Sequence, residues 1–143
     1  MLHIFAAILI PCAVAQETPA RSECSAANFA SPNYPDEAIR VRIQGVVTAF
    51  VLIGRDGKPE KAEYTGHSIL TPGAKASTDA TRLAQTCAGT TLKVIYRFVM
   101  EPIYLPDSGR RCPPVPPVRS VDFKEPNEFV VKYSYEPVDC NLN

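Results

Sequence analysis

Cysteine is the residue type with the clearest chemistry in this sequence. There are five cysteines, and Cys12 lies inside an apolar N-terminal run. The other four are the candidates for disulfide bonds: Cys24, Cys87, Cys112 and Cys140. An even number of cysteines in a small exported domain is typical of two disulfides. Three pairings are possible. We expect Cys24–Cys87 and Cys112–Cys140, because the second bond would close a local loop around the last predicted strand.

Metal binding and catalysis have less support. His67 is the only histidine after residue 15, and there is no C-x-x-C pair, so a zinc site is not expected. His67 precedes Ser68 in a predicted turn, where adjacent side chains rarely face each other, and there is no G-x-S-x-G motif. A phosphate loop and a dinucleotide fingerprint are also missing. We therefore predict a protein that is not an enzyme and uses neither a cofactor nor a metal.

The N-terminus has the pattern of an export signal. Residues 2–15 form an apolar run shorter than the ~20 residues that cross a bilayer, and it ends in Ala13-Val14-Ala15, a small-x-small cleavage pattern. We expect cleavage near Ala15 and a periplasmic or secreted location, with retention as an anchor as the alternative. Fifteen basic residues balance fifteen acidic ones, so no overall field favours nucleic acid or a membrane surface. We expect the protein to bind no nucleic acid and to contact a membrane only indirectly.

The first half of the remaining chain predicts a helix and a hairpin. Pro35 suits a first helical turn, and Asp36 and Glu37 complement the positive end of the helix dipole, so a helix is expected at 35–42. Residues 46–53 are nearly all apolar and predict a strand covered on both faces. The Asp56-Gly57 pair then predicts a tight turn and a return strand, which gives a hairpin over 45–65.

The second half predicts a helix and two strands. Thr71-Pro72 opens a helix whose small side chains up to Cys87 share one face, and Gly89 ends it. The buried face is expected to contain Ala76, Ala80, Leu83, Ala84 and Cys87. Apolar residues alternate over 92–101 and again over 129–136, which predicts two further strands. The prolines between them cannot donate ladder hydrogen bonds, so 102–120 is interpreted as an extended connector.

These elements predict the α+β class. We expect a small antiparallel sheet of three to four strands packed by two helices. The chain divides into a signal peptide (1–15), an extended lead-in (16–32), a domain (33–101), a proline-rich connector (102–120), and a final strand with a tail (121–143).

Residues 34–57 resemble the opening of the TonB C-terminal domain. That family begins with Tyr-Pro, an alanine three residues later and a short helix. A glycine then starts an apolar strand that ends in an Asp-Gly hairpin. The matching positions here are Tyr34, Pro35, Ala38, Gly45, Val47, Asp56 and Gly57. The resemblance implies a TonB C-terminal-like fold over 33–101.

The resemblance also implies a mode of binding. TonB-like domains bind extended segments of outer-membrane receptors or other envelope proteins along a free edge of the sheet. We expect that edge on one of the last two predicted strands. Its candidate residues are Leu92, Val94, Tyr96 and Phe98, or Phe129, Val131, Tyr133 and Tyr135. The alternative is a secreted, disulfide-stabilised structural or inhibitor-like protein on the same scaffold. The sequence does not indicate an oligomeric state.

Overall fold

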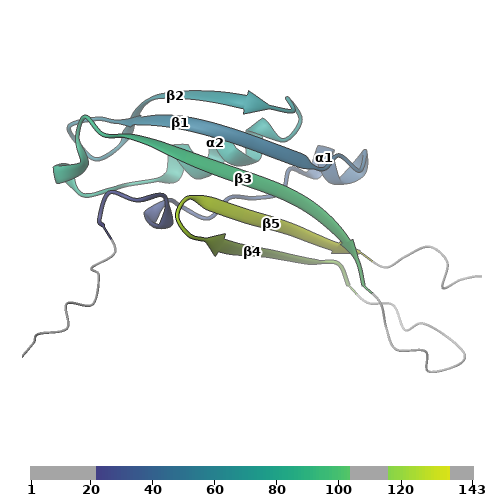
Figure 1. Ribbon diagram of the computed structural model, residues 1–143. Coiled ribbons are helices and arrows are strands. Elements are labelled where there is room, and N and C mark those ends of the chain that lie inside the picture. The colour runs from purple at the N-terminus through teal and green to yellow at the C-terminus, as the bar shows by residue number, and fades with distance from the viewer. Residues whose placement is uncertain (1–21, 104–115, 136–143) are drawn as a thin grey trace, which may run out of the picture.

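The computed structural model describes residues 22–103 and 116–135, which form an α+β domain (Figure 1). The helical elements are η1 (Ala26–Asn28), α1 (Asp36–Arg40), α2 (Thr71–Ala80) and η2 (Gln85–Cys87). The strands are β1 (Gly45–Ile53), β2 (Pro59–Gly66), β3 (Thr91–Pro102), β4 (Val118–Lys124) and β5 (Glu128–Tyr135). The predicted fold class and both predicted α-helices are confirmed.

The sheet has five strands in the order β2-β1-β3-β5-β4. It is larger than the three to four strands predicted, because β4 begins inside the segment 102–120 that we interpreted as a connector. The sheet is also not wholly antiparallel, since β5 pairs with β3 in parallel. Strand β4 starts at Val118, directly after Pro117, so Pro116 and Pro117 lie outside the ladder.

The predicted hairpin over 45–65 is confirmed as β1 and β2, which pair antiparallel. Its turn is held by a hydrogen bond from the Gly54 amide to the Lys58 carbonyl, 2.8 Å, and by the Asp56 side chain, which accepts from the Lys58 amide at 3.0 Å. Gly57 has φ +74°, a conformation that glycine adopts without steric penalty.

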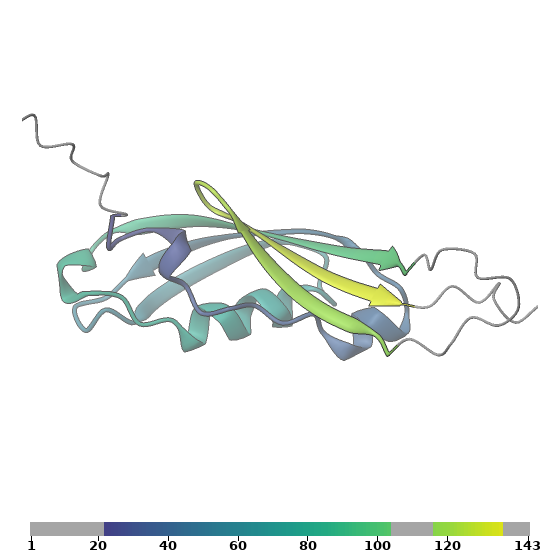
Figure 2. The same cartoon turned by 90° about the horizontal axis from the view of Figure 1, so that it is seen from below.

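Both helices lie on one side of the sheet, here called the helix side, and the other side is the open side (Figures 1 and 2). The core fills the helix side: Val47, Ala49 and Val51 of β1 are fully buried there. Phe50 points to the open side and is 45% exposed, so the prediction that β1 is covered on both faces is wrong. The apolar run at 46–53 did not indicate burial on both faces, because apolar side chains are also common on protein surfaces.

The segment before α1 is tied to the far end of the domain by a disulfide between Cys24 and Cys87. The segment also packs into the core through Ala26 and Phe29. One of the two expected disulfides is therefore present. Cys112 and Cys140 lie outside the described residues, so their pairing stays a prediction, as do the signal peptide at 1–15 and the lead-in up to residue 21.

Helix α2 is shorter than predicted and turns a different face to the core. Its buried residues are Gly73, Ala74, Ser77 and Thr78, whereas Ala76 and Ala80 are exposed. Burial of the Ser77 and Thr78 hydroxyls costs little free energy because each donates to a backbone carbonyl. Ser77 donates to Ala30, and Thr78 donates to Ala74. The helix stops at Ala80 because Thr81 is extended, with its side chain accepting the Ala30 amide at 2.9 Å.

Helix α1 ends in a left-handed residue that is not glycine. Arg42 has φ +57°, and the Ile43 amide reaches back to the Ala38 carbonyl at 2.9 Å. This pattern is a Schellman-type helix end, where glycine is usual. The Arg42 guanidinium lies 5.3 Å from the centre of the Tyr135 ring, so this helix end is joined to the end of β5.

We expect the Cys24–Cys87 bond to contribute substantially to stability, since it joins residues 63 apart in the chain. Replacing both cysteines in a Cys24→Ala/Cys87→Ala variant should lower the free energy of unfolding by about 4 kcal/mol, because the loop closure is lost from the unfolded state. Urea unfolding at neutral pH measures the difference. An unchanged unfolding midpoint would contradict a structural role for the bond.

We expect Gly57 to be required for close packing as well as for its positive φ. A Cβ at Gly57 would lie 2.0 Å from the Leu83 carbonyl oxygen, whereas a Cβ at Gly89, with φ +80°, meets nothing within 4 Å. Both alanine variants should lose stability through the left-handed backbone. Gly57→Ala should lose about 2 kcal/mol more than Gly89→Ala, because only it overpacks. Equal losses in thermal or urea unfolding would show that the contact with Leu83 does not matter.

Candidate functional site

The two strands predicted to supply a free edge both lie inside the sheet. Strand β3 pairs with β1 on one side and with β5 on the other, and β5 pairs with both β3 and β4. The side chains predicted to bind, Leu92, Val94, Tyr96, Phe98, Phe129, Val131, Tyr133 and Tyr135, therefore belong to interior strands, and those of Val94, Tyr96, Phe98, Phe129 and Val131 are buried. The edge prediction is wrong because β4 was not anticipated.

In the part of the chain that the structure describes, the edges of the sheet are β2 and β4. Strand β2 carries several features that discourage pairing with another chain. It begins with Pro59, it places Lys61 and Glu63 on the open side, and α2 packs against it. Charged side chains, proline and a neighbouring helix are the usual ways in which natural proteins protect an edge.

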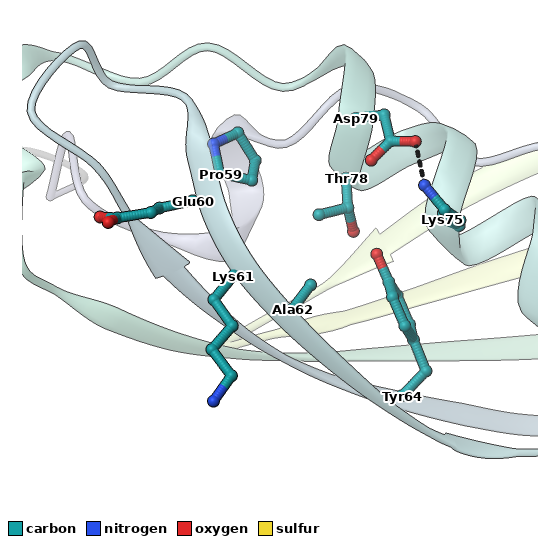
Figure 3. Close-up of a pocket in the computed structure, with 8 residues that line it drawn as sticks. All are labelled: Pro59, Glu60, Lys61, Ala62, Tyr64, Lys75, Thr78 and Asp79. Atoms are coloured by element: carbon teal, nitrogen blue, oxygen red, sulfur yellow. Dashed lines mark hydrogen bonds and ion pairs between the residues drawn. The ribbon is translucent and has the colours of Figure 1, made fainter.

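A hollow lies between β2 and α2, lined by residues such as Tyr64, Thr78 and Asp79. Figure 3 shows Tyr64 pointing toward α2 while Lys61 points away from it. Asp79 is joined to Lys75 by an ion pair of 2.6 Å. These two charged groups therefore pair with each other at the protein surface.

The pairing of β5 with β3 determines which backbone N–H and C=O groups of β4 point toward β5 and which point away from it. The Ile95 amide donates to the Asn127 carbonyl at 2.9 Å, and the Ile103 amide donates to the Tyr135 carbonyl at 2.7 Å. Backbone groups alternate in direction along a strand, so the odd-numbered residues of β5 face β3 and the even-numbered ones face β4.

The even-numbered residues of β4 stand opposite the even-numbered residues of β5, for example Ser120 opposite Lys132. Their backbone groups are thus used within the sheet. By the same alternation, three residues of β4 direct both the N–H and the C=O away from the sheet. They are Arg119, Val121 and Phe123, here called the β4 edge residues.

The side chains of the β4 edge residues lie on the helix side. Phe123 packs edge to face on Phe129, with ring centres 4.9 Å apart, and Phe129 stacks on Tyr96 at 5.7 Å. Val121 stands opposite Val131 and is 36% exposed. Arg119 forms an ion pair with Asp36 at 2.6 Å. The β4 edge therefore offers an aromatic ring, an aliphatic side chain and a cation in a row.

Charged side chains on the open side of β3, β5 and β4 pair with one another. Arg97 pairs with Glu128, and Lys132 lies between Glu101 and Asp122 at 3.9 and 3.6 Å. In the part of the chain that the structure describes, no cluster of histidine, cysteine and acidic residues could hold a metal ion. Among the described helices, none combines the length and apolar character that a membrane-spanning helix requires.

Sequence reasoning missed the β4 edge residues, although a signal was present. Val121 and Phe123 alternate with Ser120, Asp122 and Lys124, which is the period of a strand with one apolar face. The preceding prolines favoured a connector that extends through residue 120. This left a strand too short to recognise, and the hairpin between β4 and β5 was overlooked.

The residues of the motif at 34–57 lie mainly in the core and at the start of β1. Tyr34 is 1% exposed, and its hydroxyl donates to the Ile43 carbonyl at 2.7 Å. Ala38 and Val47 are fully buried, and Gly45 begins β1. Burial raises the pKa of Tyr34 to about 12. Tyr34, Ala38 and Val47 thus belong to the hydrophobic core beneath the sheet, whereas Asp56 is exposed in the hairpin turn.

We expect Tyr34 to make stability depend on pH above 10. The unfolded tyrosine loses its proton near the ordinary tyrosine pKa of 10.0 and the folded one near 12, so the stabilisation is present below pH 10 and is lost toward pH 12. Tyr34→Phe should be less stable than the wild type by about 1 kcal/mol at pH 7, since the hydrogen bond is lost. The gap should close and reverse as the pH rises.

Urea unfolding of both proteins between pH 7 and 11.5 measures this gap. Taking the difference between the two proteins cancels the titration of the other tyrosines and of the lysines. A gap that stays constant over this range would contradict the burial of a neutral Tyr34 hydroxyl.

Comparison with known protein families gives a match over part of the chain. Residues 30–82 match the family model described as Gram-negative bacterial TonB protein C-terminal. This segment contains α1, β1, β2 and α2, whereas β3, β4 and β5 lie beyond it. No curated protein matches the chain, and no solved structure matches it.

Proposed function

We propose that the chain, whose residues 30–82 match the TonB C-terminal family model, is a periplasmic protein-binding module that adds an extended segment of an envelope protein to β4. Domains of this family mediate protein interactions in the cell envelope. The single observation that carries the choice of β4 is its row of outward backbone groups beside an exposed Val121.

Strand addition suits this edge for a physical reason. An added strand gains main-chain hydrogen bonds along the edge, and its alternate side chains reach the surface beside it. Strand β4 offers three outward residues and places its charged Asp122 and Lys124 on the opposite side from Val121 and Phe123. By contrast, β2 is flanked by α2. The partner in this proposal is an outer-membrane receptor or another envelope protein.

Two further features support an exported binding protein. The Cys24–Cys87 bond is of a kind that persists in oxidising compartments such as the periplasm. The sequence begins with the pattern of an export signal, which is expected to be removed near Ala15. Binding by strand addition requires no catalytic group and no cofactor.

The proposal predicts that proline on β4 abolishes binding and that proline on β2 does not. Val121→Pro removes an outward N–H and leaves the pairing with β5 intact, because the Val121 amide does not face β5. Ala62→Pro is the matched control, since the same alternation directs the Ala62 amide away from β1 on the other edge. Binding to peptides selected from a random 12-residue display library should weaken about tenfold or more only in Val121→Pro.

The oxidised protein is used for selection, and fluorescence anisotropy then gives the dissociation constants. Circular dichroism and thermal unfolding check that both proline variants are folded. If Ala62→Pro alone lost binding, the partner would lie on β2. If a folded, oxidised protein selected no peptide, the alternative of a structural or inhibitor-like secreted protein would be favoured.

A further inference from the structure

The chemistry of the segment that β4 would bind can be read from three rows of side chains on the helix side of the sheet. Each row crosses β3, β5 and β4 in register and ends at one of the β4 edge residues. The rows are Tyr96–Phe129–Phe123, Phe98–Val131–Val121 and Met100–Tyr133–Arg119. Residues opposite each other in neighbouring strands have side chains on the same face, so each row specifies the next residue outward.

The first row is aromatic from the core to the edge. Tyr96 is fully buried, Phe129 is nearly so, and Phe123 is only partly buried, with Phe129 packed on one side of its ring. The next residue outward from Phe123 therefore lies against an incompletely covered aromatic ring. Aromatic and large aliphatic side chains are the ones that gain most from such a cross-strand contact.

The second row becomes exposed at its last member. Phe98 and Val131 are buried, whereas Val121 is 36% exposed. An aliphatic side chain opposite Val121 would remove this surface from water, and a charged one would lose hydration without a partner. The position opposite Val121 is therefore expected to be aliphatic.

The third row ends in a cation. The Arg119 guanidinium binds Asp36, whose side chain is 86% exposed, and lies 3.4 Å from the Asn33 side-chain oxygen. A guanidinium has five N–H donors, so it can donate to a second carboxylate while keeping these contacts. A basic residue opposite Arg119 would meet a like charge. The third position is therefore expected to be acidic.

The order of these positions depends on the direction of the added strand. Antiparallel pairing places partner residues directly opposite the outward residues of β4 and is slightly more stable per residue than parallel pairing. An antiparallel segment meets Phe123 first, then Val121, then Arg119. The residues between these positions face the open side, next to Ser120 and Asp122, where polar side chains suffice. Pro117 before β4 and Pro126 after it limit the paired length.

We infer that β4 selects an extended, antiparallel segment with the pattern aromatic or large aliphatic, polar, aliphatic, polar, acidic, a specificity that rests on the strand addition proposed above. The partner is thus defined by its chemistry. It is a short, unfolded, acidic-ended stretch of a protein with apolar residues at alternate positions and no proline between them.

A set of three peptides tests this pattern. The first has the core Phe-Thr-Val-Thr-Glu, the second the reversed core Glu-Thr-Val-Thr-Phe, and the third replaces the glutamate of the first with lysine. All three carry the same flanking serines and a fluorophore, and binding to the full oxidised protein is measured by anisotropy. The first peptide should bind about tenfold more tightly than the lysine peptide. Its advantage over the reversed peptide should be smaller, because parallel pairing is only slightly less stable per residue. Val121→Pro should weaken the binding of the first peptide about tenfold.

A charge exchange tests the acidic position separately. In Arg119→Glu the lysine peptide should become the better ligand and the glutamate peptide the weaker one, because the backbone pairing is unchanged while the charge is reversed. A merely structural role of Arg119 would weaken both peptides equally. Thermal unfolding of Arg119→Glu checks that the loss of the ion pair with Asp36 leaves the domain folded.

The results separate this inference from the proposed function. Equal binding of the three peptides, all lost in Val121→Pro, would overturn the pattern and leave strand addition at β4 standing. No binding of these peptides, together with no Val121-dependent peptide from the display library, would overturn both. A concentration-dependent dimer that Val121→Pro dissociates would also overturn the pattern, since the edge would then be covered by a second copy of the chain.

Discussion

The parallel pairing of β5 with β3 is the constraint on which the rest of the sheet depends. It brings Phe129 and Val131 into the core against Tyr96 and Phe98, and it uses every outward backbone group of β3 along residues 95–102. Because β5 is bonded to β3 through its odd-numbered residues, only its even-numbered residues remain for β4. The direction of the β4 backbone, and hence which residues face outward, follows from this one pairing.

Beside the hydrophobic core of the helix side, polar contacts join segments that are far apart in the sequence. The Ser77 hydroxyl of α2 donates to the Ala30 carbonyl of the N-terminal segment. Tyr96 from β3 lies within hydrogen-bond distance of both Ser77 and Thr78, at 3.2 and 3.4 Å. Burial raises the pKa of Tyr96, and in the described residues no buried side-chain nitrogen or oxygen lacks a partner. The Cys24–Cys87 bond holds the same segment in place.

The two edges of the sheet differ in how well they are protected against pairing with another chain. Strand β2 ends the sheet beside α2, whereas β4 ends it with Val118 and Val121 exposed. An edge with apolar side chains is prone to pair with another chain. The segment that matches the family model ends at Arg82, so the strand proposed to bind lies beyond the matched segment.

The amino-acid sequence by itself determined the elements that local chemistry specifies. The Asp56-Gly57 turn requires a positive φ and set the hairpin, Pro35 with its acidic neighbours set the start of α1, and the alternation at 92–101 set β3. Cys24–Cys87 was one of several pairings open to the sequence, and only the fold brought these two residues together. Tertiary structure alone decided the strand order, the buried face of α2 and the free edge. These features depend on which distant strands pair and which hydroxyls find carbonyl acceptors, and periodicity within a segment carries no information about either.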